Sequence, residues 1–164
     1  MKKLLCIGFS VILLFSGCSA TDSHIKNEIN RCFAAKATIT QKSAAYTADF
    51  QIDENGCSVA FILPEEIKGL KICYSGTGFT YEFDGLNFTA SPESESQQFL
   101  PLIFSALTDQ SGIYQTIETC VSVQGNTQYG KYYINADQDT LTPTFLEIEE
   151  ADLTVRFEPH EQNK

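Results

Sequence analysis

Hydrophobic and polar residues alternate along most of the chain with a period of two, which is typical of strands that bury one face. The clearest stretch is 46–53, where Tyr46, Ala48, Phe50 and Ile52 alternate with polar side chains. Similar alternation recurs from residue 33 to residue 157. Dipeptides that favour tight turns interrupt it at Asn55-Gly56, Asp84-Gly85 and Gly125-Asn126. The pattern predicts about nine to eleven short antiparallel strands, with 117–123 expected as one continuous strand.

Two stretches change to the helical period. Ile25, Ile29, Cys32 and Phe33 stand at helical spacing after the capping residues Asp22 and Ser23, and Leu100, Ile103, Phe104 and Leu107 repeat the spacing with Pro101 in the first turn. Two short amphipathic helices need an apolar surface, which the concave face of a curved sheet provides. We therefore expect a mainly β protein, with an antiparallel curved sheet or incomplete β-barrel and two helices on its concave face. A two-sheet sandwich is the alternative, because its strands alternate in the same way.

The inward positions of the strands outnumber what two short helices can cover. Taken singly, each of these residues is more simply explained as ordinary core, but together they predict an apolar groove that stays partly open and could accept a ligand. The residues expected to line this groove are Tyr46, Phe50, Ile52, Val59, Phe61, Leu63, Ile72, Tyr74, Phe79, Tyr81, Phe83, Phe88, Leu100, Ile103, Phe104 and Leu107.

The N-terminus has the layout of a secretory signal: Lys2 and Lys3, a largely apolar run over 4–15, and then Ser16-Gly17-Cys18. A helix of this run would rise roughly 18 Å, which is short of the ~30 Å hydrocarbon core. The tetrapeptide 15–18 resembles the lipobox of bacterial lipoproteins, although Phe15 stands where an aliphatic residue is commoner. The resemblance implies a diacylglyceryl group on Cys18 and cleavage before it. An ordinary secreted protein, in which Cys18 is incidental, is the alternative.

This interpretation divides the chain into a signal peptide over 1–17, a lipidated N-terminus and spacer over 18–23, one β domain over 24–158 and a frayed tail over 159–164. Loss of the signal removes two lysines and changes the formal net charge from −10 to −12. We expect no nucleic-acid partner, because phosphate binding needs clustered Lys and Arg. The expected location is the extracytoplasmic face of the cell membrane, held by the lipid anchor.

Four cysteines follow the anchor: Cys32, Cys57, Cys73 and Cys120. An exported chain permits two disulfides, one or none. Strand parity places Cys57 inward and both Cys73 and Cys120 outward, so Cys32 with Cys57 is the favoured bridge. The spacing of the four residues does not indicate a zinc site.

Little in the sequence favours catalysis. The two histidines, His24 and His160, lie near the chain ends, and no nucleophile, phosphate-loop or metalloprotease motif occurs. Asp137 and Asp139 have the spacing of calcium ligands, but the remaining ligands of such a loop are missing, so a turn is the simpler explanation. We expect no enzyme, no cofactor and no metal.

The order of these elements resembles the LolA-like superfamily of lipoprotein carriers and lipid-binding lipoproteins. The resemblance is carried by 59–64, followed by Leu70, Tyr74 and Gly76; by Tyr81 with Asp84-Gly85-Leu86; and by 133–137 leading to Pro143. It implies a half-barrel whose hydrophobic cavity, covered by helices, accepts acyl chains. The soluble carriers of that superfamily are not lipidated, so Cys18 favours a tethered binder over a shuttle.

Three functions are compatible with the sequence. The first is a membrane-tethered protein that binds a lipid or another hydrophobic ligand. The second is an interaction or sensing module of the cell envelope with a protein partner, for which a sealed interior is expected. The third, a degradative enzyme, would need polar groups inside the groove, where the inward positions offer only tyrosine hydroxyls.

Overall fold

The computed structural model describes residues 28–90, 99–117 and 119–159. The signal peptide, Cys18, the spacer, both histidines and residues 160–164 lie outside the described residues. The strands are β1 (Phe33–Gln41), β2 (Ala44–Asp53), β3 (Gly56–Leu63), β4 (Lys71–Tyr74), β5 (Phe79–Phe83), β6 (Leu86–Ala90), β7 (Ile113–Ile117), β8 (Cys120–Thr127), β9 (Gly130–Asp137), β10 (Pro143–Ile148) and β11 (Leu153–Pro159). One α-helix, α1 (Phe99–Thr108), and the 3₁₀ turns Glu65–Ile67 and Glu149–Ala151 complete the described elements.

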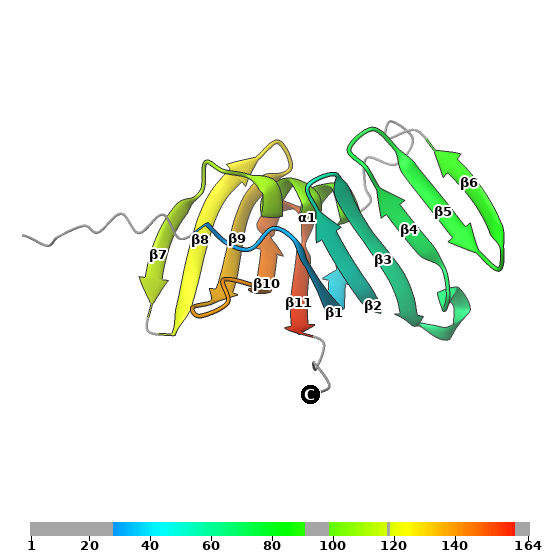
Figure 1. Ribbon diagram of the computed structural model, residues 1–164, viewed down its shortest axis with the longest axis horizontal. Coiled ribbons are helices and arrows are strands. Elements are labelled where there is room, and N and C mark those ends of the chain that lie inside the picture. The colour runs from blue at the N-terminus through cyan, green and yellow to red at the C-terminus, as the bar shows by residue number, and fades with distance from the viewer. Residues whose placement is uncertain (1–27, 91–98, 118, 160–164) are drawn as a thin grey trace, which may run out of the picture.

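All eleven strands form a single antiparallel sheet in the order β6-β5-β4-β3-β2-β1-β11-β10-β9-β8-β7. The first strand pairs with the last from Ala35 opposite Pro159 to Gln41 opposite Leu153. The two edges, β6 and β7, therefore come from the middle of the chain. Figure 1 shows them at opposite ends of a curved sheet, with α1 between the two halves. The predicted fold class is confirmed.

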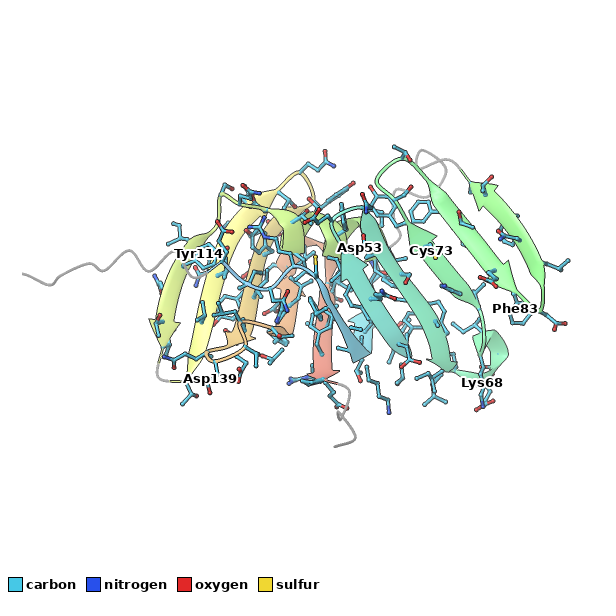
Figure 2. The ribbon with its side chains drawn as sticks, in the orientation of Figure 1. Asp53, Lys68, Cys73, Phe83, Tyr114 and Asp139 are labelled. Carbon is cyan, nitrogen blue, oxygen red and sulfur yellow. The ribbon has the colours of Figure 1, made fainter. Side chains whose placement is uncertain are left out.

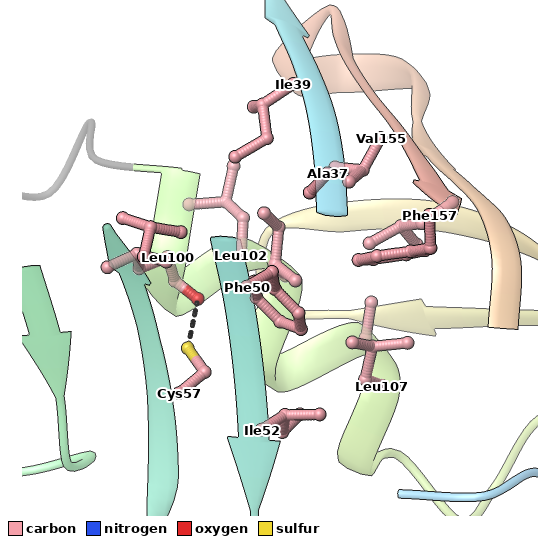
Figure 3. Close-up of a cluster of buried hydrophobic side chains, with 14 of the residues drawn as sticks. Ala37, Ile39, Phe50, Ile52, Cys57, Leu100, Leu102, Leu107, Val155 and Phe157 are labelled. Atoms are coloured by element: carbon pink, nitrogen blue, oxygen red, sulfur yellow. Dashed lines mark hydrogen bonds between the residues drawn. The ribbon is translucent and has the colours of Figure 1, made fainter. Parts of the chain in front are cut away.

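The concave face carries the hydrophobic core, as the alternation predicts. Figure 3 shows side chains of α1 among those of the central strands, with Leu100, Leu102 and Leu107 facing Phe50, Ile52 and Phe157. The rings of Phe33, Phe50 and Phe157 lie 5.2 to 5.8 Å apart between centroids. Burial of these side chains, at roughly 1.5 to 3 kcal/mol each, stabilises the curved sheet against α1.

The first predicted helix is wrong for the part that the structure describes. Residues 28–32 form no helix. The backbone N–H of Asn30 donates to the carbonyl of Leu141 at 2.7 Å, and the side-chain oxygen of Asn30 accepts from the N–H of Cys32 at 3.0 Å. Such side-chain bonds compete with helix formation. Ile29 and Phe33 are still buried, so their spacing reflects core contacts of an irregular segment.

Two predicted turns are shifted. The stretch 117–123 is not one strand, because the chain reverses between Ile117 and Cys120 and leaves Ile117 on β7. Gly125 lies inside β8, opposite Tyr132 of β9, instead of in a turn. A Cβ on Gly125 would overlap the Tyr132 ring. Gly125 is therefore explained by close packing and not by turn geometry.

The β2–β3 hairpin occurs where predicted, but with a different centre. Asp53 pairs with Gly56, so Glu54 and Asn55 form the turn. The Asp53 carboxylate accepts from the N–H groups of Asn55 and Gly56 at 2.7 and 3.1 Å. A Cβ on Gly56 would overlap the carbonyl oxygen of Tyr74, so this glycine permits close approach to β4.

Replacement of Gly125 by alanine is expected to lower the free energy of unfolding by about 1 to 3 kcal/mol, because the added methyl group would displace the buried Tyr132 ring. Urea unfolding measures the change. Asn126→Ala, on the exposed neighbour, serves as the control and should stay within about 0.5 kcal/mol of the parent. Equal stability of the two variants would contradict the packing explanation.

Candidate functional site

Within the described part of the chain, no residue covers the concave face where it reaches the tip of the β5–β6 hairpin. Phe83, Leu86 and Phe88 are 42%, 70% and 55% exposed, whereas Tyr81 beside them is buried. We call these four residues the apolar wing. Figure 2 shows Phe83 at the β5–β6 end of the molecule, away from α1.

The wing owes its geometry to one tight hairpin. Asp84 and Gly85 both have positive φ, 48° and 79°, which is the conformation of a two-residue turn that matches strand twist. This turn places Phe83 opposite Leu86 and Tyr81 opposite Phe88. Because directly opposed residues share a face, all four side chains lie on the concave side.

A row of aromatic rings connects α1 to the wing. Phe104 of α1 lies 5.7 Å from Tyr74, which lies 5.1 Å from Phe79, and the Phe79 and Tyr81 centroids are 6.2 Å apart. Tyr81 and Phe88 end the row as a parallel stack at 4.7 Å. Phe104 and Tyr74 are half-buried, Phe79 and Tyr81 are buried, and Phe88 is exposed, so the row ends at an open apolar surface.

The predicted groove residues fall into three groups. Ten are buried in the core: Phe50, Ile52, Val59, Phe61, Ile72, Phe79, Tyr81, Leu100, Ile103 and Leu107. Three are half-buried and pack against that core, namely Tyr46, Tyr74 and Phe104, and three are exposed, namely Leu63, Phe83 and Phe88. The centre of the expected groove is therefore filled by α1, and the exposed residues are those of the wing and Leu63 at the end of β3.

Side-chain contacts hold α1 in place at both ends. Near its start the Cys57 thiol donates to the carbonyl of Leu100 at 3.7 Å (Figure 3). Near its end Arg31 donates to the carbonyl of Thr108 at 3.4 Å. The hydroxyl of Tyr132 donates to the carboxylate of Asp109, just beyond the helix, at 2.8 Å. These contacts join α1 to β3, to the segment before β1 and to β9.

The charge of Asp109 is favoured by its surroundings. Burial acts to raise the pKa of Asp109, but hydrogen bonds from Ser111 and Tyr132 and the nearby Arg31 outweigh this and lower it. Burial, together with the hydrogen bond to Asp109, raises the pKa of Tyr132 well above its ordinary value. The pair is thus a neutral phenol donating to an ionised carboxylate at neutral pH.

The four described cysteines are free thiols, so the favoured Cys32–Cys57 bridge is not formed. Because residues 28–32 form no helix, Cys32 is exposed beside the buried Phe33, and β2 lies between β1 and the β3 residue Cys57. Burial raises the pKa of the Cys57 thiol well above its usual range, which disfavours the reactive thiolate. Cys73 and Cys120 lie on strands that are not neighbours, as expected.

The cavities found among the described residues lie away from the wing, and most have linings that mix polar and apolar groups. One of about 380 Å³ is lined by residues that include Gln124, Lys131, Tyr133 and Glu147. Three others, of about 260 to 420 Å³, have mixed or polar linings. None of these four cavities is an enclosed apolar chamber, whereas the wing is an open apolar surface.

Asp137 already has partners in a turn. Its carboxylate accepts from the N–H groups of Asp139 and Thr140 and from the Thr140 hydroxyl at 2.8 to 3.1 Å, and these bonds lower the pKa of Asp137. Across the described ranges no cluster of three or more His, Cys, Asp or Glu side chains could hold a metal ion. None of the helices in the described part is long and apolar enough to cross a membrane.

Three exposed apolar residues were missing from the predicted groove: Leu86 on β6 and Ile113 and Ile117 on β7. Leu86 could have been identified, because it follows the Asp84-Gly85 turn and must face Phe83. Ile113 and Ile117 lie opposite Gln124 and Cys120, on the outer face. Ile117 was instead expected to continue into the strand 117–123, because the turn before Cys120 carries no glycine or proline.

No family model and no curated protein matches the sequence. Solved structures resemble it in fold. An uncharacterised conserved protein from Thermus thermophilus is 10% identical over 80% of this chain and 78% of that chain, with a TM-score of 0.48. A LolA superfamily protein from Nitrosomonas europaea is 15% identical over 74% of this chain and 67% of that chain, with a TM-score of 0.40.

The Mycobacterium tuberculosis lipoprotein LppX is also similar, at 9% identity over 76% of this chain and 82% of that chain, with a TM-score of 0.36. The chain thus shows structural similarity to a LolA superfamily protein and to a lipoprotein. At these identities the likeness concerns fold alone, so the function is argued from the residues of this chain.

Asp109→Asn is expected to reduce stability at pH 7 and to change the pH dependence of unfolding. Because the folded state lowers the pKa of Asp109, its contribution is present above the unfolded value of 3.8 and is lost as the pH falls below it. The difference in free energy of unfolding between parent and variant should therefore become smaller from pH 6 to pH 3, as measured by urea unfolding. A difference in free energy of unfolding that stays constant with pH would contradict this role. Asp139→Asn, in an exposed turn, is the matched control.

Proposed function

We propose that this chain is a membrane-tethered, extracytoplasmic lipoprotein that binds a lipid or another hydrophobic ligand through the apolar wing, without catalysing a reaction. The observation that carries the proposal is the exposure of Phe83, Leu86 and Phe88 side by side on the concave face. A charged, acidic protein gains nothing in solubility from such a patch, and contiguous exposed apolar surface commonly marks a binding site.

The chemistry of the wing favours an acyl chain or a similar uncharged group. Every concave position of β4, β5 and β6 is apolar or aromatic: Ile72, Tyr74, Phe79, Tyr81, Phe83, Leu86, Phe88 and Ala90. The charged residues of these strands, Lys71 and Glu82, oppose one another on the outer face. A flat aromatic surface without charge contacts hydrocarbon well and offers nothing to an anionic headgroup.

A lipid on Cys18 would keep this surface beside its source of ligand. Two acyl chains, at about 0.8 kcal/mol per buried CH₂, hold a protein stably at a bilayer. The net charge of −12 that the mature chain would carry repels an anionic surface, so the domain would be tethered rather than embedded.

Binding of cis-parinaric acid, a fluorescent acyl-chain probe, tests the wing. The double variant Leu86→Ser/Phe88→Ser should weaken binding at least about tenfold, because two exposed apolar contacts are removed. Ile113→Ser/Ile117→Ser removes comparable apolar surface from the outer face of β7 and should bind like the parent. Binding at the wing would be contradicted if both variants weakened probe binding equally, or if neither variant weakened it.

Replacement of Cys18 by alanine tests the anchor separately. The parent should sediment with membranes after cell fractionation and carry the added mass of a diacylglyceryl group, and the variant should lack that mass. Cys120→Ala, which alters a thiol outside the lipobox, should remain with membranes. A Cys18→Ala variant that still carries the lipid mass would exclude this residue as the site of attachment.

A protein-interaction module is the second candidate function. It is favoured by the centre of the concave face, where α1 covers the sheet and its residues Leu100, Ile103 and Leu107 are fully buried. A sealed centre removes the deep cavity that a wholly enclosed lipid needs. If parinaric acid does not bind the parent chain, this second function becomes the better explanation of the exposed wing.

A further inference from the structure

The edge strand β6 has no feature that would prevent it from pairing with another strand. Its residues, Leu86 to Ala90, include neither a charge nor a proline, and its register with β5 contains no bulge. Within the described residues β6 pairs with β5 alone. Natural sheets usually protect an exposed edge with charged residues, proline or bulges. In a chain in which 20% of the residues are charged, an edge strand without charges, prolines or bulges is expected to pair with another strand.

The hairpin geometry determines which backbone groups of β6 face outward. In a two-residue hairpin Phe83 and Leu86 form a hydrogen-bonded pair, and such pairs alternate along antiparallel strands. Tyr81 with Phe88 and Phe79 with Ala90 are then also hydrogen-bonded pairs. Asn87 and Thr89 therefore direct their N–H and C=O groups away from β5, toward the free edge.

We propose that β6 is a homodimer interface, in which the β6 strands of two copies pair antiparallel about a two-fold axis at Phe88. In this register Asn87 lies opposite Thr89 of the second copy, and their outward groups form four hydrogen bonds across the interface. Phe88 faces Phe88 of the second copy as the close, non-hydrogen-bonded pair between them. The hydrogen-bonding alternation that the β5–β6 hairpin imposes on β6 is therefore compatible with a two-fold axis at Phe88.

The side chains of β6 are self-complementary in this register, as a two-fold interface requires. The large Leu86 meets the small Ala90 of the second copy, two aromatic rings meet at the axis, and the polar Asn87 and Thr89 meet on the outer face. No like charges face each other, despite the formal net charge of −10. Pairing brings Leu86 and Phe88 of the two copies, the wing residues that are more than half exposed, side by side on the concave face.

The other edge, β7, is a weaker candidate for the same role. It is also uncharged, but its exposed Ile113 and Ile117 lie on the outer face. Pairing there would leave the wing as exposed as before. Pairing through β6 instead joins the wings of two copies into one apolar surface on the concave side, which accounts for more of the exposed area.

Cysteine crosslinking of the full chain in bacterial membranes tests the interface. The parent for this experiment carries Cys32, Cys73 and Cys120 replaced by serine and keeps the buried Cys57. After mild oxidation, Phe88→Cys should yield at least about tenfold more covalent dimer than the parent, because the close pair brings Cα atoms to ~4.5 Å. Gln115→Cys, at the centre of β7, should yield no more than the parent.

A pair of variants that keep Phe88 makes the register itself testable. Asn87→Cys and Thr89→Cys should each give little dimer alone, because identical residues lie two positions apart across the axis. Coexpressed, the two variants should crosslink to each other, since hydrogen-bonded pairs place Cα atoms ~5.5 Å apart. Similar yields from all positions, or none above the parent, would overturn the proposal.

Thr89→Pro distinguishes strand pairing from simple contact of apolar surfaces. The N–H that proline removes faces the free edge, so the β5–β6 hairpin keeps its hydrogen bonds and edge strands tolerate proline. Added to Phe88→Cys, it should reduce the dimer about tenfold with little change in melting temperature. Unchanged crosslinking, stronger crosslinking at Gln115→Cys or a crosslink to a different protein would each refute the β6 homodimer. The readout needs no lipid, so it is independent of the proposed function.

Discussion

The pairing of β1 with β11 determines the rest of the architecture. Because the two ends of the chain meet at the centre of the sheet, the strands from its middle, β6 and β7, become the edges. Ten strand spacings of ~4.8 Å separate these edges along the curve. The described part of the connection between them, which begins with α1, lies on the concave face, and α1 is about 15 Å long.

This helix divides the concave face into a closed centre and an open wing. A helix of ten residues with six of them buried covers the central strands but does not reach β5 and β6. The contacts of Cys57, Arg31 and Tyr132 hold its two ends, so the covered area is set by where these side chains lie. What remains uncovered is an aromatic surface beside an unprotected edge strand, and both proposals arise from this one feature.

Much of the fold could be predicted from the sequence because alternation reports one-sided burial directly. The hairpin at Asp84-Gly85, the helix over 100–107 and the inward face of most strands followed from local patterns. The division of the groove could not be predicted, because burial of Phe61 and exposure of Phe83 depend on where α1 lies and not on either strand. Gly125 was misassigned for a similar reason, since the Tyr132 ring that requires it comes from the next strand.

The central claim is that an apolar ligand binds at the wing rather than elsewhere on the sheet. Amide NMR spectra with a spin-labelled stearate test it most directly, because the label broadens resonances of nearby residues. The account predicts broadening of Phe83, Leu86 and Phe88 on β5 and β6, with Ile113 and Ile117 on β7 unchanged. Equal broadening on both edges, or a stearate that leaves every wing resonance sharp, would contradict it.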